Sequence, residues 1–135
     1  MKKIVVSSRS KAKEFISDVP WAAISISDHR DDLPKLNACQ RVGILQLVFE
    51  DTEFNTPDSF KLEHAKQIIE FVREVNDKIE VLLVHCFAGW SRSPAVAAAI
   101  DKMLNKKNIT RYWEDYEPNM LVFDTIVKEW GGNGN

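Results

Sequence analysis

The chain has 135 residues, of which 44% are apolar and 28% are charged, and its formal net charge is −2. This length fits one domain with a modest core, and the charge excludes a global positive field for nucleic acid or anionic lipid. No apolar run is long enough to span a membrane, and the apolar stretch after Met1 is too short for a secretory signal. We expect a cytoplasmic protein without a nucleic-acid or membrane partner, and the composition leaves the oligomeric state open.

Four segments have the composition and length of β-strands: Lys3–Val6, Ala22–Ser27, Val42–Val48 and Glu80–His85. The fourth segment is an almost continuous apolar run, which predicts a central parallel strand covered on both faces. In the second segment, apolar residues alternate with more polar ones, and this pattern predicts a strand nearer the edge of the sheet.

Four further segments favour helices: Ser8–Ser17, Ser59–Asn76, Ser93–Asn105 and Asn119–Trp130. Asp58 or Ser59 is expected to cap the second helix. The third is apolar nearly all round, which predicts a buried central helix. Gly131 and Gly132 are expected to end the last helix.

Alternation of strands and helices predicts a three-layer α/β fold, with a mostly parallel central sheet of about four strands flanked by helices. We expect one domain over residues 1–130 and a flexible C-terminal tail over 131–135. Ligands of such sheets bind at the carboxyl ends of strands. The long polar loops Asp28–Gln40 and Phe49–Asp58 are therefore expected to border the site.

The segment between the fourth strand and the third helix is the main functional candidate: His85-Cys86-Phe87-Ala88-Gly89-Trp90-Ser91-Arg92-Ser93. A loop between a strand and a helix can turn successive backbone N–H groups inward and form an anion-binding nest. Gly89 permits a sharp turn, and Pro94 suits the first turn of a helix. Ser93 is then expected to cap that helix.

Arg92 supplies a planar fork that can bind two phosphate oxygens at once. The same positive environment favours the thiolate form of Cys86, which would be aimed at the phosphorus of a bound ester. His85 is expected to face away from solvent and to order the loop by hydrogen bonding. Trp90 either forms a wall of the pocket or packs beneath the loop.

Hydrolysis of a phosphoester also needs a proton donor for the leaving oxygen. Asp51 is the preferred candidate because it follows a predicted strand near the Cys86 strand, and Asp58 is the alternative. Cys39 has no partner motif and is interpreted as structural or incidental. The three histidines are scattered, so we expect no metal site and no cofactor.

The Cys86 segment resembles the signature of the cysteine-dependent protein tyrosine phosphatase superfamily, particularly its dual-specificity group and the compact bacterial and phage members. The matching pattern is His85-Cys86-x-x-Gly89-x-x-Arg92-Ser93. The segment 50–55 resembles the general-acid loop of that group, and Pro118-Asn119 resembles the start of the last helix in the small bacterial members. The similarity runs from about Val42 to Leu104, roughly half of the chain.

The resemblance implies a phosphomonoester hydrolase, most of all a protein-tyrosine or dual-specificity phosphatase, acting on a phosphorylated protein or a small phosphoester. It implies that Cys86 becomes a cysteinyl-phosphate, that Asp51 is the general acid, and that Ser93 stabilises the departing thiolate. Arg92 and the backbone amides of residues 87–92 would bind the phosphate oxygens. The signature loop lacks the lysines of phosphoinositide-directed relatives, which argues against an inositol headgroup.

Other interpretations remain. A reactive cysteine in an anion-binding loop also occurs in sulfur transfer and arsenate reduction. Arsenate reductases of the low-molecular-weight phosphatase type, however, place that loop near the N-terminus and use further cysteines, whereas Cys39 is the only other cysteine here. A phosphate-binding module that recognises phosphoproteins with little or no turnover is another candidate. A phosphatase of nucleotides or RNA 5′ ends fits the same chemistry.

Overall fold

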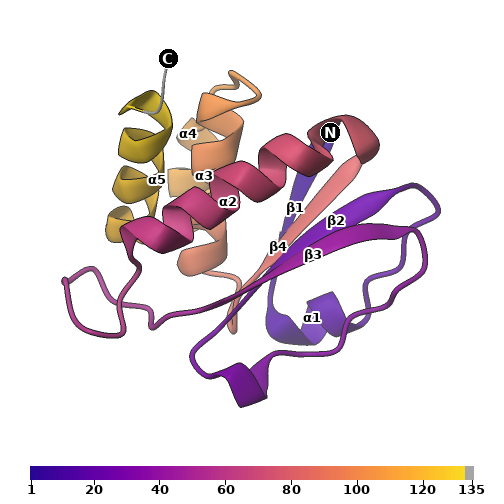
Figure 1. Ribbon diagram of the computed structural model, residues 1–135, viewed down its shortest axis with the longest axis horizontal. Helices are drawn as coiled ribbons and strands as arrows, with labels where there is room; N and C mark the ends of the chain where they lie inside the picture. Colours follow the sequence, from indigo (N-terminus) through magenta and orange to yellow (C-terminus); the bar gives the residue numbers. More distant parts are fainter. Residues whose placement is uncertain (133–135) are drawn as a thin grey trace.

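The computed structural model describes residues 1–132, and its centre is a four-stranded, fully parallel sheet in the order β1-β4-β2-β3 (Figure 1). The strands are β1 (Lys3–Ser7), β2 (Trp21–Ser27), β3 (Arg41–Val48) and β4 (Val81–His85). Each begins and ends within one residue of its predicted bounds, and the α/β class is confirmed. The central position of β4, between β1 and β2, is also as predicted.

The expectation that β2 lies near the edge is wrong, because this strand pairs with β4 on one side and β3 on the other. All seven of its residues are buried. Ile24 and Ile26 belong to the main core, whereas Trp21 and Ala23 belong to a second cluster. Alternate residues point to opposite faces of a strand, so the pattern in the sequence distinguishes two buried faces rather than core from solvent. Ser25 is tolerated because its hydroxyl has a buried hydrogen-bond partner.

Helices cover both faces of the sheet, as Figure 1 shows: α2, α3 and α5 lie on one side and α1 lies on the other. Their bounds are α1 (Arg9–Lys13), α2 (Leu62–Val75), α3 (Arg92–Met103), α4 (Thr110–Asp115) and α5 (Met120–Gly132). Short 3₁₀ turns occupy Arg30–Asp32 and Asn76–Lys78. None of the helices within residues 1–132 is long and apolar enough to cross a membrane.

Helix α2 begins at Leu62, so neither Asp58 nor Ser59 is its N-cap. The buried Ser59 hydroxyl instead closes a turn with Thr56, accepting from its N–H at 3.0 Å and donating to its carbonyl at 2.8 Å. The helix starts only after this turn, with Lys61 at the N-cap position and the Lys61 N–H donating to His64 Nδ1 at 2.8 Å.

The predicted buried helix is α3, whose residues from Arg92 to Asp101 are all buried. Helix α1 is shorter than predicted, and α4 was not predicted because six residues show no reliable helical period. Helix α5 includes Gly131 and Gly132 instead of ending before them. A glycine in a helix costs only about 1 kcal/mol, so a helix can continue through it. The remaining part of the expected tail, 133–135, lies outside the described residues.

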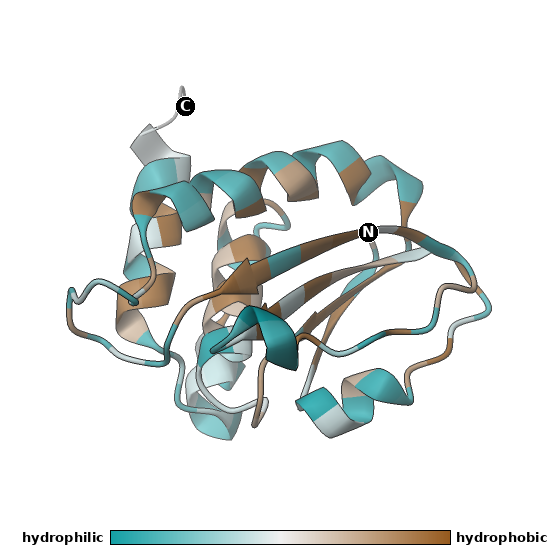
Figure 2. Cartoon of the chain, turned by 60° about the horizontal axis from the view of Figure 1, so that its bottom comes forward, coloured by the Kyte–Doolittle hydropathy of each residue, from teal (hydrophilic) through white to brown (hydrophobic). Residues whose placement is uncertain are grey.

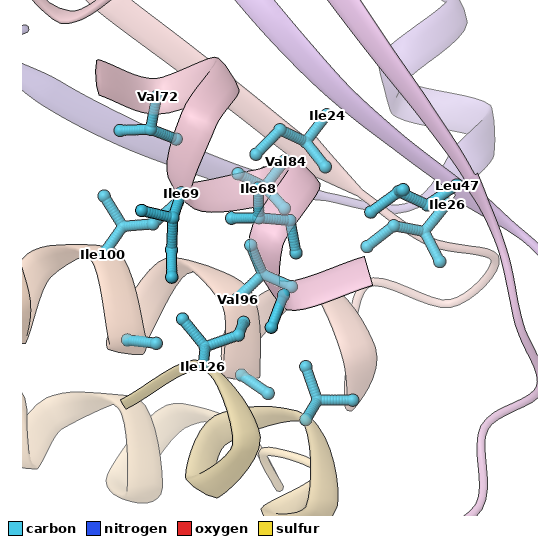
Figure 3. Packing of buried hydrophobic residues seen from close by; sticks show 14 of the residues in the cluster. Ile24, Ile26, Leu47, Ile68, Ile69, Val72, Val84, Val96, Ile100 and Ile126 are labelled. Atoms are coloured by element: carbon cyan, nitrogen blue, oxygen red, sulfur yellow. The ribbon is translucent and has the colours of Figure 1, made fainter. Parts of the chain in front are cut away.

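The main core lies between the sheet and the three helices on that side. Figure 3 shows side chains from β2, β3, β4, α2, α3 and α5 meeting there, with Ile24, Val84 and Val96 among them. In Figure 2 the strands are brown along most of their length, as expected for a sheet covered on both faces. This packing holds the carboxyl ends of β2, β3 and β4 at one edge of the molecule.

The central position of β2 predicts a large difference between two similar truncations. Ile24→Ala removes methyl groups from a fully buried site and should lower the free energy of unfolding by about 2–5 kcal/mol. Val42→Ala, on the edge strand β3 where Val42 is 45% exposed, should cost less than about 1 kcal/mol. Urea denaturation of both variants measures the difference, and equal losses would contradict this account of β2.

Candidate active site

Cys86 lies directly after β4, and its side chain is almost fully buried, with 2% exposed. Its Sγ lies 3.2 Å from the Ser93 hydroxyl and accepts from the Gly89 N–H at 3.3 Å. The prediction that Ser93 is the N-cap of α3 is wrong, because Ser91 takes that position. The first turn of the helix instead presents the Ser93 hydroxyl to the sulfur.

Gly89 gives the loop its sharp turn, with a backbone φ of +71°. A Cβ at this position would lie 2.7 Å from the Ser7 carbonyl carbon and the Ser8 nitrogen. The Arg9 N–H also donates to the Phe87 carbonyl at 3.0 Å. The loop between β4 and α3 therefore packs directly against the end of β1, and only glycine fits at position 89.

Arg92 is 4% exposed, and one of its terminal nitrogens holds two loops together. Nη1 donates to Asp28 Oδ1 at 2.6 Å and to the Phe49 carbonyl at 2.8 Å. Nε is buried and has no hydrogen-bond partner within residues 1–132. Part of the guanidinium is thus bound to the protein, while its Nε donor is left without an acceptor among the described residues.

Asp28 is a site residue that the sequence analysis did not identify, although it expected the loop starting there to border the site. Asp28 is the first residue after β2, and β2 is the direct neighbour of β4. Side chains at the carboxyl ends of neighbouring parallel strands lie close together. Because the sequence analysis placed β2 near the edge of the sheet, it did not predict that Asp28 lies next to the end of β4.

Asp51 lies beside the loop between β4 and α3, as expected from its place after β3. Its Oδ1 accepts from the Ser91 hydroxyl at 3.0 Å and from Asn119 Nδ2 at 2.8 Å. Asn119 Nδ2 also donates to the Thr52 carbonyl at 3.0 Å, and Asn119 Oδ1 accepts from the Val122 N–H at 3.1 Å. Asn119 is 1% exposed, so a buried amide fixes the position of this carboxylate. The sequence analysis placed Asn119 only at a helix start.

Asp58, the alternative acid, is exposed and makes no side-chain hydrogen bond within residues 1–132. It lines a small pocket of about 220 Å³ together with Asp28, Phe49 and His64. Only its backbone carbonyl is engaged, by the Glu50 N–H at 2.8 Å. Of the two candidates, Asp51 and not Asp58 forms a hydrogen bond with the loop between β4 and α3.

His85 is fully buried behind the loop, as expected, with Nδ1 3.3 Å from the Cys86 carbonyl and Nε2 2.6 Å from the Ser25 hydroxyl. A carbonyl can only accept, so Nδ1 carries the proton and Nε2 of the neutral ring accepts from Ser25. Burial lowers the pKa of His85, the Cys86 carbonyl opposes this, and Arg9 and Arg92 lower it further. A neutral ring in this position orders the loop.

The remaining loop residues face outward. Phe87 is 68% exposed and Trp90 is 49% exposed, with the Trp90 ring edge-on to Tyr116 at 6.3 Å between centroids. Trp90 therefore does not pack beneath the loop. Cys39 is an exposed free thiol. Within residues 1–132, no three His, Cys, Asp or Glu side chains are grouped to hold a metal ion.

The lowered pKa values of the buried His85 and the half-buried His64 predict acid sensitivity. Burial is also the main cause of the lowered pKa of His64. The unfolded chain binds these protons at a higher pH than the folded chain, so stability is complete above about pH 6.5 and falls as the pH drops below it. The loss should reach at most about 1.4 kcal/mol per pH unit for each histidine. Urea denaturation at pH 5–8 should show a smaller slope in His85→Gln and His64→Gln, and an unchanged slope in both would contradict this.

The sequence matches no protein-family model, and no curated protein matches it. The fold, however, is similar to that of solved structures. Human DUSP28 has a TM-score of 0.63 at 16% identity, over 96% of this chain and 92% of that one. PTPMT1 in complex with PI(5)P has a TM-score of 0.63 at 14% identity, over 98% and 95% of the two chains. Human tyrosine phosphatase-like serine/threonine/tyrosine-interacting protein has a TM-score of 0.60 at 19% identity, over 84% and 78%.

At these identities the similarity concerns the fold alone. The resemblance to the compact bacterial and phage members stays a prediction. The parallel sheet with its flanking helices is the fold of the tyrosine and dual-specificity phosphatases.

Proposed function

We propose that this protein is a phosphomonoester hydrolase, a protein-tyrosine or dual-specificity phosphatase that acts through a cysteinyl-phosphate. The observation that carries the proposal is the placement of Cys86 and Arg92 at the two ends of the loop between β4 and α3. The Cys86 sulfur accepts from the Gly89 N–H and lies 3.2 Å from the Ser93 hydroxyl, while Arg92 Nε is buried without an acceptor within residues 1–132. A buried guanidinium donor is costly to leave unpaired, and a tetrahedral oxyanion above the loop would satisfy it.

Binding of the phosphate uses the loop from Phe87 to Arg92. The backbone N–H groups of the loop and the free donors of Arg92 take the phosphate oxygens that lie around the phosphorus. Asp28 acts as a positioning residue, since its bond to Nη1 holds the guanidinium plane in place. The N-terminus of α3 adds a partial positive charge.

In the first step, the Cys86 thiolate attacks phosphorus in line with the leaving oxygen. The S–P bond forms as the P–O bond breaks, and Asp51 donates its proton to the departing oxygen. The Ser91 hydroxyl and the Asn119 amide hold Asp51 beside the loop for this transfer. Asn119 is a positioning residue here, because it acts through Asp51.

In the second step, Asp51 removes a proton from water, which attacks the phosphorus. The new P–O bond forms as the S–P bond breaks, and the electron pair returns to the Cys86 sulfur. The Ser93 hydroxyl, 3.2 Å from that sulfur, stabilises the thiolate as it departs. Phosphate leaves, and Asp51 is again protonated for the next cycle.

A module that binds phosphorylated partners without turnover is the second candidate. The structural similarity to a protein described as phosphatase-like and interacting is the observation that favours it. Such a module would keep the oxyanion site and lack hydrolysis. The chain retains candidates for nucleophile, arginine and acid, which favours the enzyme.

Hydrolysis of p-nitrophenyl phosphate in EDTA tests the proposal. The wild type should release p-nitrophenolate, and Cys86→Ser should lower kcat by at least about 1,000-fold, because a serine hydroxyl in this loop is a poor nucleophile. Cys39→Ser is the matched control, since Cys39 is exposed and remote from the described hydrogen bonds of the site, and it should retain full activity.

If the wild type shows no turnover while titration calorimetry detects vanadate binding, the binding module is correct and the enzyme assignment is wrong. Absence of both turnover and vanadate binding would contradict the interpretation of the whole loop as an oxyanion site.

The general acid can be identified from its dependence on the leaving group. Asp51→Asn should lower kcat by about 100-fold or more on phenyl phosphate, whose phenolate needs protonation. The loss should be several-fold smaller on p-nitrophenyl phosphate, whose leaving anion is more stable. Asp58→Asn is the control with the same change of charge, and steady-state kinetics on both substrates compares them. A leaving-group effect confined to Asp58→Asn would assign the acid to Asp58.

A further inference from the structure

A groove of about 470 Å³ begins at the catalytic loop and runs towards α4 and α5. Ser91 and Asp51 line the end nearest to the loop, so the groove opens directly beside the reacting groups. The groove therefore offers space for a residue next to the phosphorylated residue of a protein substrate. The groove plays no part in the chemical steps proposed above.

The walls of the groove are aromatic and exposed. Trp113 is 40% exposed, and its ring stands edge-on to Phe123 with 5.0 Å between centroids. Tyr116 lies between Trp90 and Tyr112, at 6.3 Å and 6.4 Å. These neighbours hold the two rings in place and leave surface open to a ligand. Large exposed aromatic residues in soluble proteins are enriched at binding sites.

The charged side chains that line the groove are all acidic. Asp51, Glu53 and Glu117 line it, and no lysine, arginine or histidine does. Glu53 already accepts from the Met120 N–H at 2.6 Å, and Asp51 is held by Ser91 and Asn119. The Glu117 carboxylate makes no hydrogen bond or ion pair within residues 1–132, while its backbone N–H donates to the Trp90 carbonyl at 3.1 Å. Glu117 is thus anchored at its backbone and available at its side chain.

We propose that this groove over Trp113, Tyr116 and Glu117 binds an arginine or lysine side chain beside the phosphorylated residue. The substrate would then be a phosphoprotein segment with flanking basic residues. An aromatic face attracts a guanidinium or ammonium group, and its methylene stem covers apolar surface. Glu117 supplies the opposite charge. This inference rests on the proposed phosphatase activity.

The same charges act against polyanionic substrates. An inositol headgroup with several phosphates, or the 5′ end of an RNA, would bring further negative charge towards these three carboxylates. The pocket lined by Phe87 does not compensate, because its one cation, Arg9, is balanced by Asp32, while Asp28 is already paired with Arg92. Flanking basic residues are therefore complementary to the surface around the loop.

Two phosphotyrosine peptides test the inference. They carry arginine in one case and glutamate in the other on both sides of the phosphotyrosine, and are otherwise identical. Phosphothreonine versions are measured in parallel. The kcat/KM for the arginine peptide should exceed that for the glutamate peptide by about tenfold at low salt, and the ratio should shrink at high ionic strength. The ratio cancels any change in the chemical step itself.

Glu117→Arg should abolish or reverse the preference for the arginine peptide. Glu74→Arg is the matched control, because Glu74 lies in the last turn of α2, which leads to the amino end of the sheet. It changes the net charge equally and should leave the ratio as in the wild type. Trp113→Leu should reduce the ratio without reversing it.

The outcomes separate the two proposals. Turnover of p-nitrophenyl phosphate with equal rates on both peptides, or a preference for the glutamate peptide, would overturn the inference and leave the phosphatase standing. A preference that survives Glu117→Arg would also overturn it. Absence of all turnover would overturn the proposed function, on which the inference depends.

Discussion

The buried guanidinium of Arg92 is the constraint on which the arrangement of the site depends. A charge in the interior costs several kcal/mol unless it is paired and hydrogen-bonded. The fold offsets this cost with acceptors from two neighbouring strand ends, the Asp28 carboxylate after β2 and the Phe49 carbonyl after β3. Pairing one charge therefore brings three segments of the chain together at the carboxyl edge of the sheet.

A second set of hydrogen bonds joins the loop that carries Asp51 to the start of the last helix. The buried Asn119 amide bonds to Asp51 and to the Thr52 carbonyl, and its backbone N–H donates to the Ser91 carbonyl at 3.0 Å. Each buried polar atom of Asn119 has a hydrogen-bond partner. Like Arg92, this side chain therefore holds separate segments of the chain together, although it carries no charge. The position of Asp51 is thus set by a residue almost seventy positions away in the chain.

Much of this could be predicted from sequence, because the signals are local. Hydrophobic periodicity located the four strands and the long helices, and the signature run located Cys86 and Arg92. What the sequence did not reveal depends on spatial neighbours. The alternation in β2 is the same for an edge strand and for a strand between two cores, so Asp28 was missed as a partner of Arg92. The role of Asn119 was also missed, because its hydrogen bonds to Asp51, Thr52 and Ser91 exist only where the start of α5 meets these two loops.

The strand order also has a consequence for how the protein is made. The strand that carries Cys86 at its end is the last in sequence, yet it lies between β1 and β2. The first strand must therefore wait for a partner, Lys3 pairing with Val81, until most of the chain has been synthesised. Pairing over such sequence distances slows folding. On the ribosome, Cys86 would emerge directly after the strand that completes the sheet, so the site around its thiol forms only after the other three strands have been synthesised.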